Sequence, residues 1–116
     1  MTIRERSVGD VTILDIGGRI TVQDGGDVLR EALERLILQG QCQLVLDCEH
    51  VPYVDTTAIS EIVWGYTSLI RRGGSLKLLK LSPHVHQVLF ITKLLTVFET
   101  FTDEAAAVES FRTASV

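Results

Sequence analysis

The sequence predicts an α/β domain, with a mixed, mostly parallel sheet of about four to five strands and about four helices packed against it. Apolar runs of strand length alternate with longer stretches in which apolar residues recur every three or four positions, as they do on one face of a helix. Only a glycine-containing turn separates the first two runs, which predicts a hairpin. Strands and helices then alternate, and this order gives parallel neighbouring strands with helices on the sheet.

Two strands and a helix are expected in the first third of the chain. The strands span 3–8 and 11–16, joined by Gly9-Asp10, a pair that suits a tight turn. The second strand is apolar on both faces, as in the interior of a sheet. A helix is expected from Asp27 to the C-capping Gly40, with an inward stripe of Val28, Leu29, Ala32, Leu33, Leu36 and Ile37.

The central segment combines a buried strand with a capped helix. Leu44 to Leu46 form a continuous apolar run, typical of a strand covered on both faces, and Cys48 extends it as a small buried hydrophobe. Asp55-Thr56-Thr57 starts the next helix, because short oxygen-bearing side chains accept hydrogen bonds from the unpaired N–H groups of a first turn. Gly73-Gly74 ends that helix, and its expected inward residues are Ile59, Ile62, Val63, Tyr66, Leu69 and Ile70.

Two further strands and two helices complete the chain. Leu76 to Leu79 form a strand, and Ser82-Pro83 suits a helix start, since serine is a good cap and proline fits the first helical position. A short strand is expected around 97–101, and Thr102-Asp103-Glu104 caps the last helix. The expected inward residues are Val85, Val88, Leu89 and either Ile91 or Thr92 in the third helix, and Ala105, Val108 and Phe111 in the last.

Composition limits the class of protein. The 116 residues suit a single domain, 1–116, and 46% apolar with 22% charged residues is a globular balance. The net charge of −4 argues against a nucleic-acid partner. No apolar run approaches the roughly 20 residues that span a bilayer, and the first residues lack a signal-peptide apolar region. We therefore expect a soluble cytoplasmic protein without membrane insertion.

Neither an enzyme nor a metal site is indicated. Cys42 and Cys48 alone cannot hold a metal, and His84 and His86 diverge by about 200° on a helix. No Ser-His-Asp or Cys-His grouping can be argued, so we expect no catalytic residue and no cofactor. Four glycines within 17–26 invite a phosphate-cradle interpretation, but the Gly-Lys-Ser/Thr ending of a P-loop is absent, which favours a plain turn.

Several segments carry a family resemblance. They are 16–20, 44–47, 51–59, 71–78, the Ser82-Pro83 helix start and 101–111. Within them, Asp55-Thr56-Thr57-Ala58-Ile59 is similar to a signature of Asp, Ser, Ser or Thr, Gly and Leu at a helix start. In order and spacing these segments resemble STAS domains, and among them the stand-alone anti-sigma-factor antagonists of bacteria. The resemblance covers nearly the whole chain and implies the STAS fold.

The resemblance also implies a protein-interaction switch. In such antagonists the second hydroxyl residue after the aspartate, here Thr57, is phosphorylated by a partner that is both anti-sigma factor and serine kinase. A PPM-type phosphatase removes the phosphate. The unphosphorylated form binds the kinase and displaces the sigma factor, and a second copy of the chain is a further candidate partner. The residues expected at the partner surface are Thr21, Asp24, Asp55, Thr56, Ala58, Ser60, Glu61 and Trp64.

Three positions depart from the family pattern. Ala58 replaces a glycine and is expected to place a methyl where a partner approaches, Thr21 stands where an acidic residue is common, and Thr57 replaces a serine. Trp64 is expected opposite the apolar stripe of its helix, as part of a contact patch. Two other functions stay open: a structural STAS subunit of a signalling or lipid-transport assembly, in which 55–57 is only interface, and a nucleotide-binding module that uses the glycine-rich loop.

Overall fold

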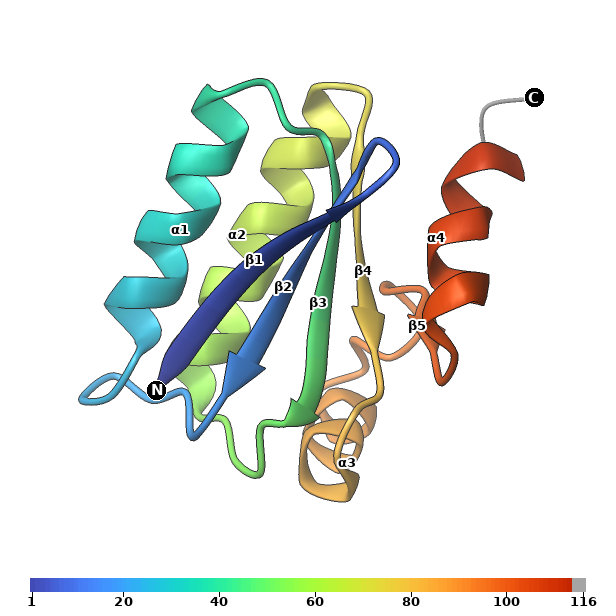
Figure 1. Ribbon diagram of the computed structural model, residues 1–116. Helices are drawn as coiled ribbons and strands as arrows, with labels where there is room; N and C mark the ends of the chain where they lie inside the picture. Colours follow the sequence, from blue (N-terminus) through green and yellow to red (C-terminus); the bar gives the residue numbers. More distant parts are fainter. Residues whose placement is uncertain (114–116) are drawn as a thin grey trace.

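The computed structural model describes residues 1–113 and confirms the predicted fold class (Figure 1). Its elements are β1 (Thr2–Val8), β2 (Val11–Gly17), α1 (Gly26–Leu38), β3 (Gln43–His50), α2 (Thr56–Arg71), β4 (Ser75–Leu79), α3 (Pro83–Ile91), β5 (Thr100–Phe101) and α4 (Glu104–Thr113). The five-stranded sheet follows chain order. The β1–β2 hairpin is antiparallel and every later pair is parallel, as the alternation of strands and helices predicted.

Helices cover both faces of the sheet, but unequally. α1 and α2 lie side by side on one face, whereas α4 alone packs against β3, β4 and β5 on the other (Figure 1). The larger core lies between the sheet and α1 and α2, and it also includes Val85 and Leu89 of α3. The smaller core, under α4, consists of Val11, Ile13, Val45, Leu79, Ala107 and Phe111. Among the described residues, no helix has the length and apolar character needed to cross a membrane.

The helical stripes were predicted correctly in their centres and wrongly at their ends. Val28 in the first turn of α1 and Ile70 in the last turn of α2 are 46% and 47% exposed. Each neighbours a fully buried leucine, and one residue along a helix turns about 100° away from that leucine. Gly65 takes an inward position in α2 that the sequence did not reveal. A Cβ there would stand 3.0 Å from the Leu33 Cδ1, so the glycine allows α1 and α2 to approach closely.

The segment from α3 to α4 departs most from expectation. Ile91 and Thr92 are both exposed, because α3 ends at Ile91. The strand expected at 97–101 is reduced to Thr100–Phe101, since Phe98 turns into the larger core and meets the Tyr66 ring edge-on at 5.0 Å. In α4 the inward alanine is Ala107 and not Ala105, which is exposed.

Candidate functional site

Two loops meet where β2 and β3 end, at the edge of the sheet where α1 and α2 begin (Figure 1). Three backbone hydrogen bonds join the two loops. The Gly18 N–H donates to the His50 carbonyl at 2.9 Å, and the Ile20 N–H donates to the Tyr53 carbonyl at 3.0 Å. The Asp55 N–H donates to the Ile20 carbonyl at 3.2 Å. The 18–26 loop and the 51–55 loop therefore form one surface, at the end of a parallel sheet where sites commonly lie.

Asp55 caps α2, as predicted, and also ties this helix to the neighbouring loop. One carboxylate oxygen accepts from the Ala58 N–H at 3.0 Å, and the other accepts from the Val22 N–H at 2.8 Å. These backbone donors, Ala58 first and then Val22, lower the pKa of Asp55 below its ordinary value. Its negative charge is thus a stable part of this surface at neutral pH.

The glycine-rich loop is closed upon itself and leaves no phosphate cradle. Asp24 and Gly26 both donate their backbone N–H groups to the Thr21 carbonyl, at 3.2 and 3.0 Å. The Thr21 N–H donates to the Asp24 carbonyl at 2.9 Å, and Asp24 also receives the terminal ammonium of Met1 at 3.4 Å. The Met1 side chain fills the space over Gly25, where a Cβ would lie only 2.2 Å from the Met1 Sδ. The backbone N–H groups of Thr21, Asp24 and Gly26 are thus used within the loop and are not free to bind a phosphate.

Thr57 is half-buried in the first turn of α2, and its hydroxyl reaches solvent. Within residues 1–113 this hydroxyl has no protein hydrogen-bond partner, yet every fully buried side-chain nitrogen or oxygen there is hydrogen-bonded. The Thr57 oxygen is therefore accessible. Its neighbour Thr56 is exposed, and the Thr56 carbonyl accepts from the exposed Ser60 hydroxyl at 2.9 Å. The structure brings these three hydroxyl residues together with Asp55, Thr21 and Asp24 at one edge.

Ala58 does not lie at this surface, and the expectation that its methyl meets a partner is wrong. Its exposed fraction is 0%, and it belongs to the larger core between the sheet and α1 and α2. Ala58 is the third residue of α2, where the helical turn directs the side chain inward. Alanine in place of glycine therefore extends the apolar face of α2 and leaves the outer surface unchanged.

Glu61 and Trp64 are also engaged within the protein. The guanidinium carbon of Arg30, from α1, lies 3.6 Å from the Trp64 ring centroid, and Arg30 also pairs with Glu61 at 3.1 Å and Glu34 at 2.9 Å. Trp64 is half-buried and packs against the larger core. Trp64 therefore does not lie opposite the apolar stripe, and Arg30 over its ring joins α1 to α2, whereas its contact with a partner stays a prediction.

One feature of this edge carried no signal in the sequence. The guanidinium carbon of Arg19 lies 4.7 Å from the centroid of the Tyr53 ring, and the His84 ring stacks on Tyr53 with a centroid distance of 4.7 Å and an interplanar angle of 19°. These residues come from three separate segments. Their stack joins the start of α3 to the two loops, and only the folded chain reveals it.

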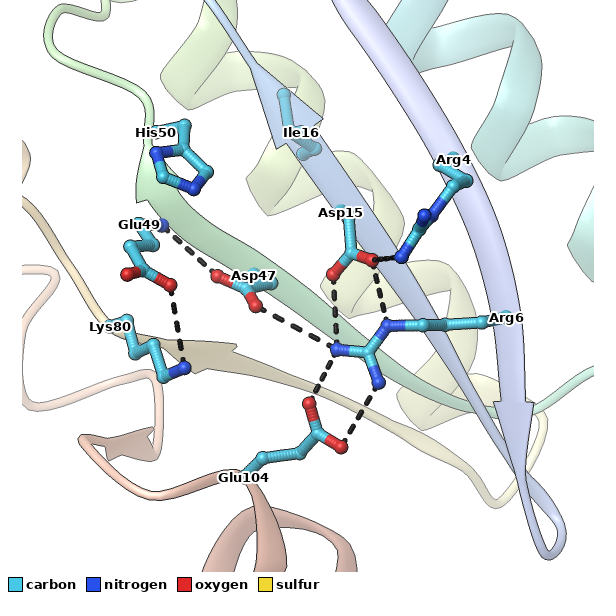
Figure 2. Close-up of a pocket in the computed structure, with 9 residues that line it drawn as sticks. All are labelled: Arg4, Arg6, Asp15, Ile16, Asp47, Glu49, His50, Lys80 and Glu104. Carbon is cyan, nitrogen blue, oxygen red and sulfur yellow. Dashed lines mark hydrogen bonds and ion pairs between the residues drawn. The ribbon is translucent and has the colours of Figure 1, made fainter.

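A second polar cluster lies on the face of the sheet that α4 covers (Figure 2). It lines a pocket of about 440 Å³, whose residues are Arg4, Arg6, Asp15, Ile16, Asp47, Glu49, His50, Lys80 and Glu104. In Figure 2 the Arg6 guanidinium points between Asp15 and Glu104, with Asp47 at 3.8 Å. Lys80 pairs with Glu49 at 3.4 Å. Each of the four carboxylates in the cluster therefore has a cationic neighbour, and the pair between Arg6 and Glu104 joins α4 to the sheet.

The described part of the chain offers no metal site, since no three of its His, Cys, Asp and Glu residues are grouped to hold an ion. Cys48 is buried as predicted, and its burial raises the pKa of the thiol to about 12. His84 and His86 flank the buried Val85 at the start of α3.

A family model described as STAS domain matches residues 3–107, and the chain belongs to this family. The Anti-sigma F factor antagonist of Paenibacillus polymyxa is 22% identical over 90 residues, which cover 77% of each chain. The predicted resemblance to STAS domains and anti-sigma-factor antagonists is thereby confirmed.

Solved structures show the same fold. An anti-sigma factor antagonist from Mycobacterium paratuberculosis matches with a TM-score of 0.86 at 16% identity, over 96% of this chain and 93% of that one. The Bacillus cell fate determinant SpoIIAA in its phosphorylated form matches with a TM-score of 0.75 at 16% identity, over 94% and 98% of the two chains.

Proposed function

We propose that this protein is a phosphorylation-controlled interaction switch of the anti-sigma-factor-antagonist type, with Thr57 as the phosphoacceptor. The unphosphorylated chain binds a partner that is both anti-sigma factor and serine kinase, and phosphorylation releases it. The observation that carries the proposal is the accessible Thr57 hydroxyl in the first turn of α2, two residues after the capping Asp55. The relatives described as anti-sigma factor antagonists support this class of protein.

The chemical step requires only an accessible hydroxyl on this side. The Thr57 oxygen forms a bond to the γ-phosphorus of ATP, the bond from that phosphorus to the ADP oxygen breaks, and the hydroxyl proton passes to a base of the kinase. A PPM-type phosphatase later transfers the phosphoryl group to water and restores the hydroxyl.

The fold can carry the added charge. A phosphate on Thr57 brings roughly −1.5 to −2 charges at neutral pH. Near a helix amino terminus a negative charge is stabilised by about 0.3–1 kcal/mol, because the unpaired N–H groups and the helix dipole face it. Thr57 lies in the first turn of α2 and also touches the first residue of α1, Gly26. Phosphorylation therefore need not rearrange the domain.

The partner interface is the part that phosphorylation would disrupt. Asp55 already places a negative charge beside Thr57, and its backbone donors keep this carboxylate ionised. A further charge that becomes desolvated without a counter-charge costs several kcal/mol. Weakening a complex 100-fold needs only about 2.7 kcal/mol. Local repulsion is therefore sufficient for switching, without an allosteric transition.

The test is to incubate the protein with ATP and the kinase encoded nearest to its gene, and to locate the phosphate by mass spectrometry. We expect one phosphate, on Thr57, in the wild type and in Thr56→Ala, and none in Thr57→Ala. Thr56→Ala is the matched control, because Thr56 is the exposed neighbour in the same helical turn. Absence of modification, with Thr57→Ala leaving partner binding and signalling unchanged, would favour a structural STAS subunit instead.

A further inference from the structure

Gly26 is an unusual residue for its place. It is buried at the first position of α1, where glycine is less favourable than alanine. Its backbone does not lie in the left-handed region, unlike that of Gly25, whose φ is 95°. The conformation of the chain therefore does not call for glycine at position 26.

The surroundings of Gly26, in contrast, leave too little room for a side chain at this position. A Cβ at this position would stand 3.0 Å from the Thr21 carbonyl oxygen and 3.2 Å from the Cγ2 methyl of Thr57. Both separations are tighter than ordinary van der Waals contact. The Thr57 methyl thus lies over the bare Cα of Gly26, at the junction of α1 and α2.

This contact has a consequence for the neighbouring hydroxyl. The methyl, the hydroxyl and the hydrogen on the Cβ of threonine occupy the three staggered positions of one rotor. Placing the methyl against Gly26 therefore also fixes the position of the hydroxyl, which the structure leaves open to solvent. A serine at position 57 would lack the methyl, and its hydroxyl could rotate into the space over Gly26.

We propose that Gly26 is a positioning residue for Thr57: the bare Cα of Gly26 receives the threonine methyl and thereby selects the rotamer that presents the hydroxyl outward. The contact is a property of the fold alone, whereas its role in phosphoryl acceptance rests on the proposed function. The site is accordingly built for threonine, and the pairing of Gly26 with Thr57 explains why the serine of the family pattern is not required here.

The first test measures the rotamer without any kinase. Three-bond NMR couplings from the Thr57 Cγ2 to the backbone N and carbonyl C report χ1 in isotopically labelled protein. We expect a single rotamer in the wild type, altered couplings in Gly26→Ala, and unchanged Thr57 couplings in Thr56→Ser, the matched control. Rotamer-averaged couplings in the wild type would overturn the proposal, as would wild-type couplings in Gly26→Ala.

A double-mutant cycle gives the second test. We expect Gly26→Ala to lower the folding equilibrium constant about tenfold when Thr57 is present, through overpacking. In the Thr57→Ser background, Gly26→Ala should lower the folding equilibrium constant by a factor at least about threefold smaller than with Thr57 present. The methyl is then absent, and only the contact with the Thr21 carbonyl remains. Equal losses in the two backgrounds would contradict the contact. If Gly26→Ala fails to fold, its recovery in Gly26→Ala/Thr57→Ser provides the same comparison.

The functional arm uses the kinase that phosphorylates Thr57. We expect Gly26→Ala to lower kcat/KM for phosphorylation about threefold or more, because an accessible rotor has three wells and only one presents the hydroxyl. Gly26→Ala should not lower kcat/KM in the Thr57→Ser background, because no methyl meets the added Cβ, which only excludes the serine hydroxyl from the space over position 26. An unchanged kcat/KM in Gly26→Ala would refute the positioning role. Absence of phosphorylation in the wild type would refute the proposed function and leave the rotamer contact to be judged by the couplings.

Discussion

Replacing Arg6 by methionine should destabilise the domain and loosen α4. Arg6 connects β1 to β2 and to the first residue of α4. Asp15 accepts from the Arg6 Nε at 2.7 Å and Nη2 at 3.1 Å, and Glu104 accepts from Nη1 at 3.0 Å and also from Nη2. Methionine keeps much of the apolar stem but leaves these carboxylates without their common donor (Figure 2).

The exposure of the three side chains sets the magnitude. Arg6, Asp15 and Glu104 are 29%, 26% and 32% exposed, so their pairs lie between surface ion pairs and buried ones. Surface pairs contribute about 0.2–1 kcal/mol, and hydrogen bonds to charged groups about 1.5–3 kcal/mol. About 1 kcal/mol for each two-pronged pair, with added repulsion between the abandoned carboxylates, gives a loss of about 2–3 kcal/mol at neutral pH.

The effect should depend on pH in a defined direction. Hydrogen bonds from Arg6 lower the pKa of Asp15 below its ordinary 3.8 and that of Glu104 below its ordinary 4.5. A carboxylate whose pKa is lower in the folded state stabilises the fold fully above its unfolded pKa, and this contribution is lost as the pH falls through the folded value. The difference between wild type and Arg6→Met should therefore shrink as the pH falls below about 4.

Urea unfolding at pH 7 and pH 3 tests this reasoning. For an m-value of about 1.5 kcal/mol/M, the expected loss at pH 7 shifts the midpoint by about 1–2 M. Arg4→Met is the matched control, since Arg4 lies on the same strand, is 78% exposed and makes one 3.3 Å contact with Asp15. Equal shifts for the two variants, or a shift for Arg6→Met that does not change with pH, would refute the role assigned to Arg6.

Two smaller predictions concern Asp55 and the cysteines. Asp55→Ala should accelerate hydrogen exchange at both the Ala58 and the Val22 amide. Asp55→Asn keeps one acceptor oxygen for the helix cap and should accelerate exchange mainly at Val22. Equal acceleration at both amides in Asp55→Asn would contradict the assignment of one carboxylate oxygen to each amide. A thiol reagent at neutral pH should modify the half-buried Cys42 and should not modify Cys48 until denaturant is added. The reason is that burial raises the pKa of the Cys48 thiol to about 12. Rapid reaction of both thiols in the native protein would contradict the burial of Cys48.

The features predicted correctly are those that local pattern determines. The Gly9-Asp10 turn joins neighbouring strands, and the alternation of apolar runs gives the order of strands and helices. The Asp55 cap depends on a backbone N–H only three residues away. Such interactions are encoded within a few positions of the chain, so a single sequence is sufficient to find them.

The features that were missed depend on distant segments. Arg6 and Glu104 are separated by 98 positions, and no local pattern predicts that they meet. The sequence predicts an outward Trp64, but its side chain packs against the larger core and Arg30 of the neighbouring helix lies over its ring. In both cases tertiary packing determines the environment. Ala58 is different, because it precedes the buried Ile62 by four residues and the buried Leu69 by eleven. Helical periodicity alone therefore places Ala58 on the inward stripe of α2, and the expectation of an outward methyl came from the family pattern.

A phosphate on Thr57 is proposed to control association with an anti-sigma factor. Calorimetry tests this by measuring the Kd between the anti-sigma factor kinase and this protein, once unphosphorylated and once carrying phosphate on Thr57 alone. We expect binding at least about 100-fold weaker after phosphorylation, which corresponds to about 2.7 kcal/mol. We also expect the two forms to give the same circular dichroism spectrum. Equal affinities of the two forms for the kinase would refute a switch at Thr57.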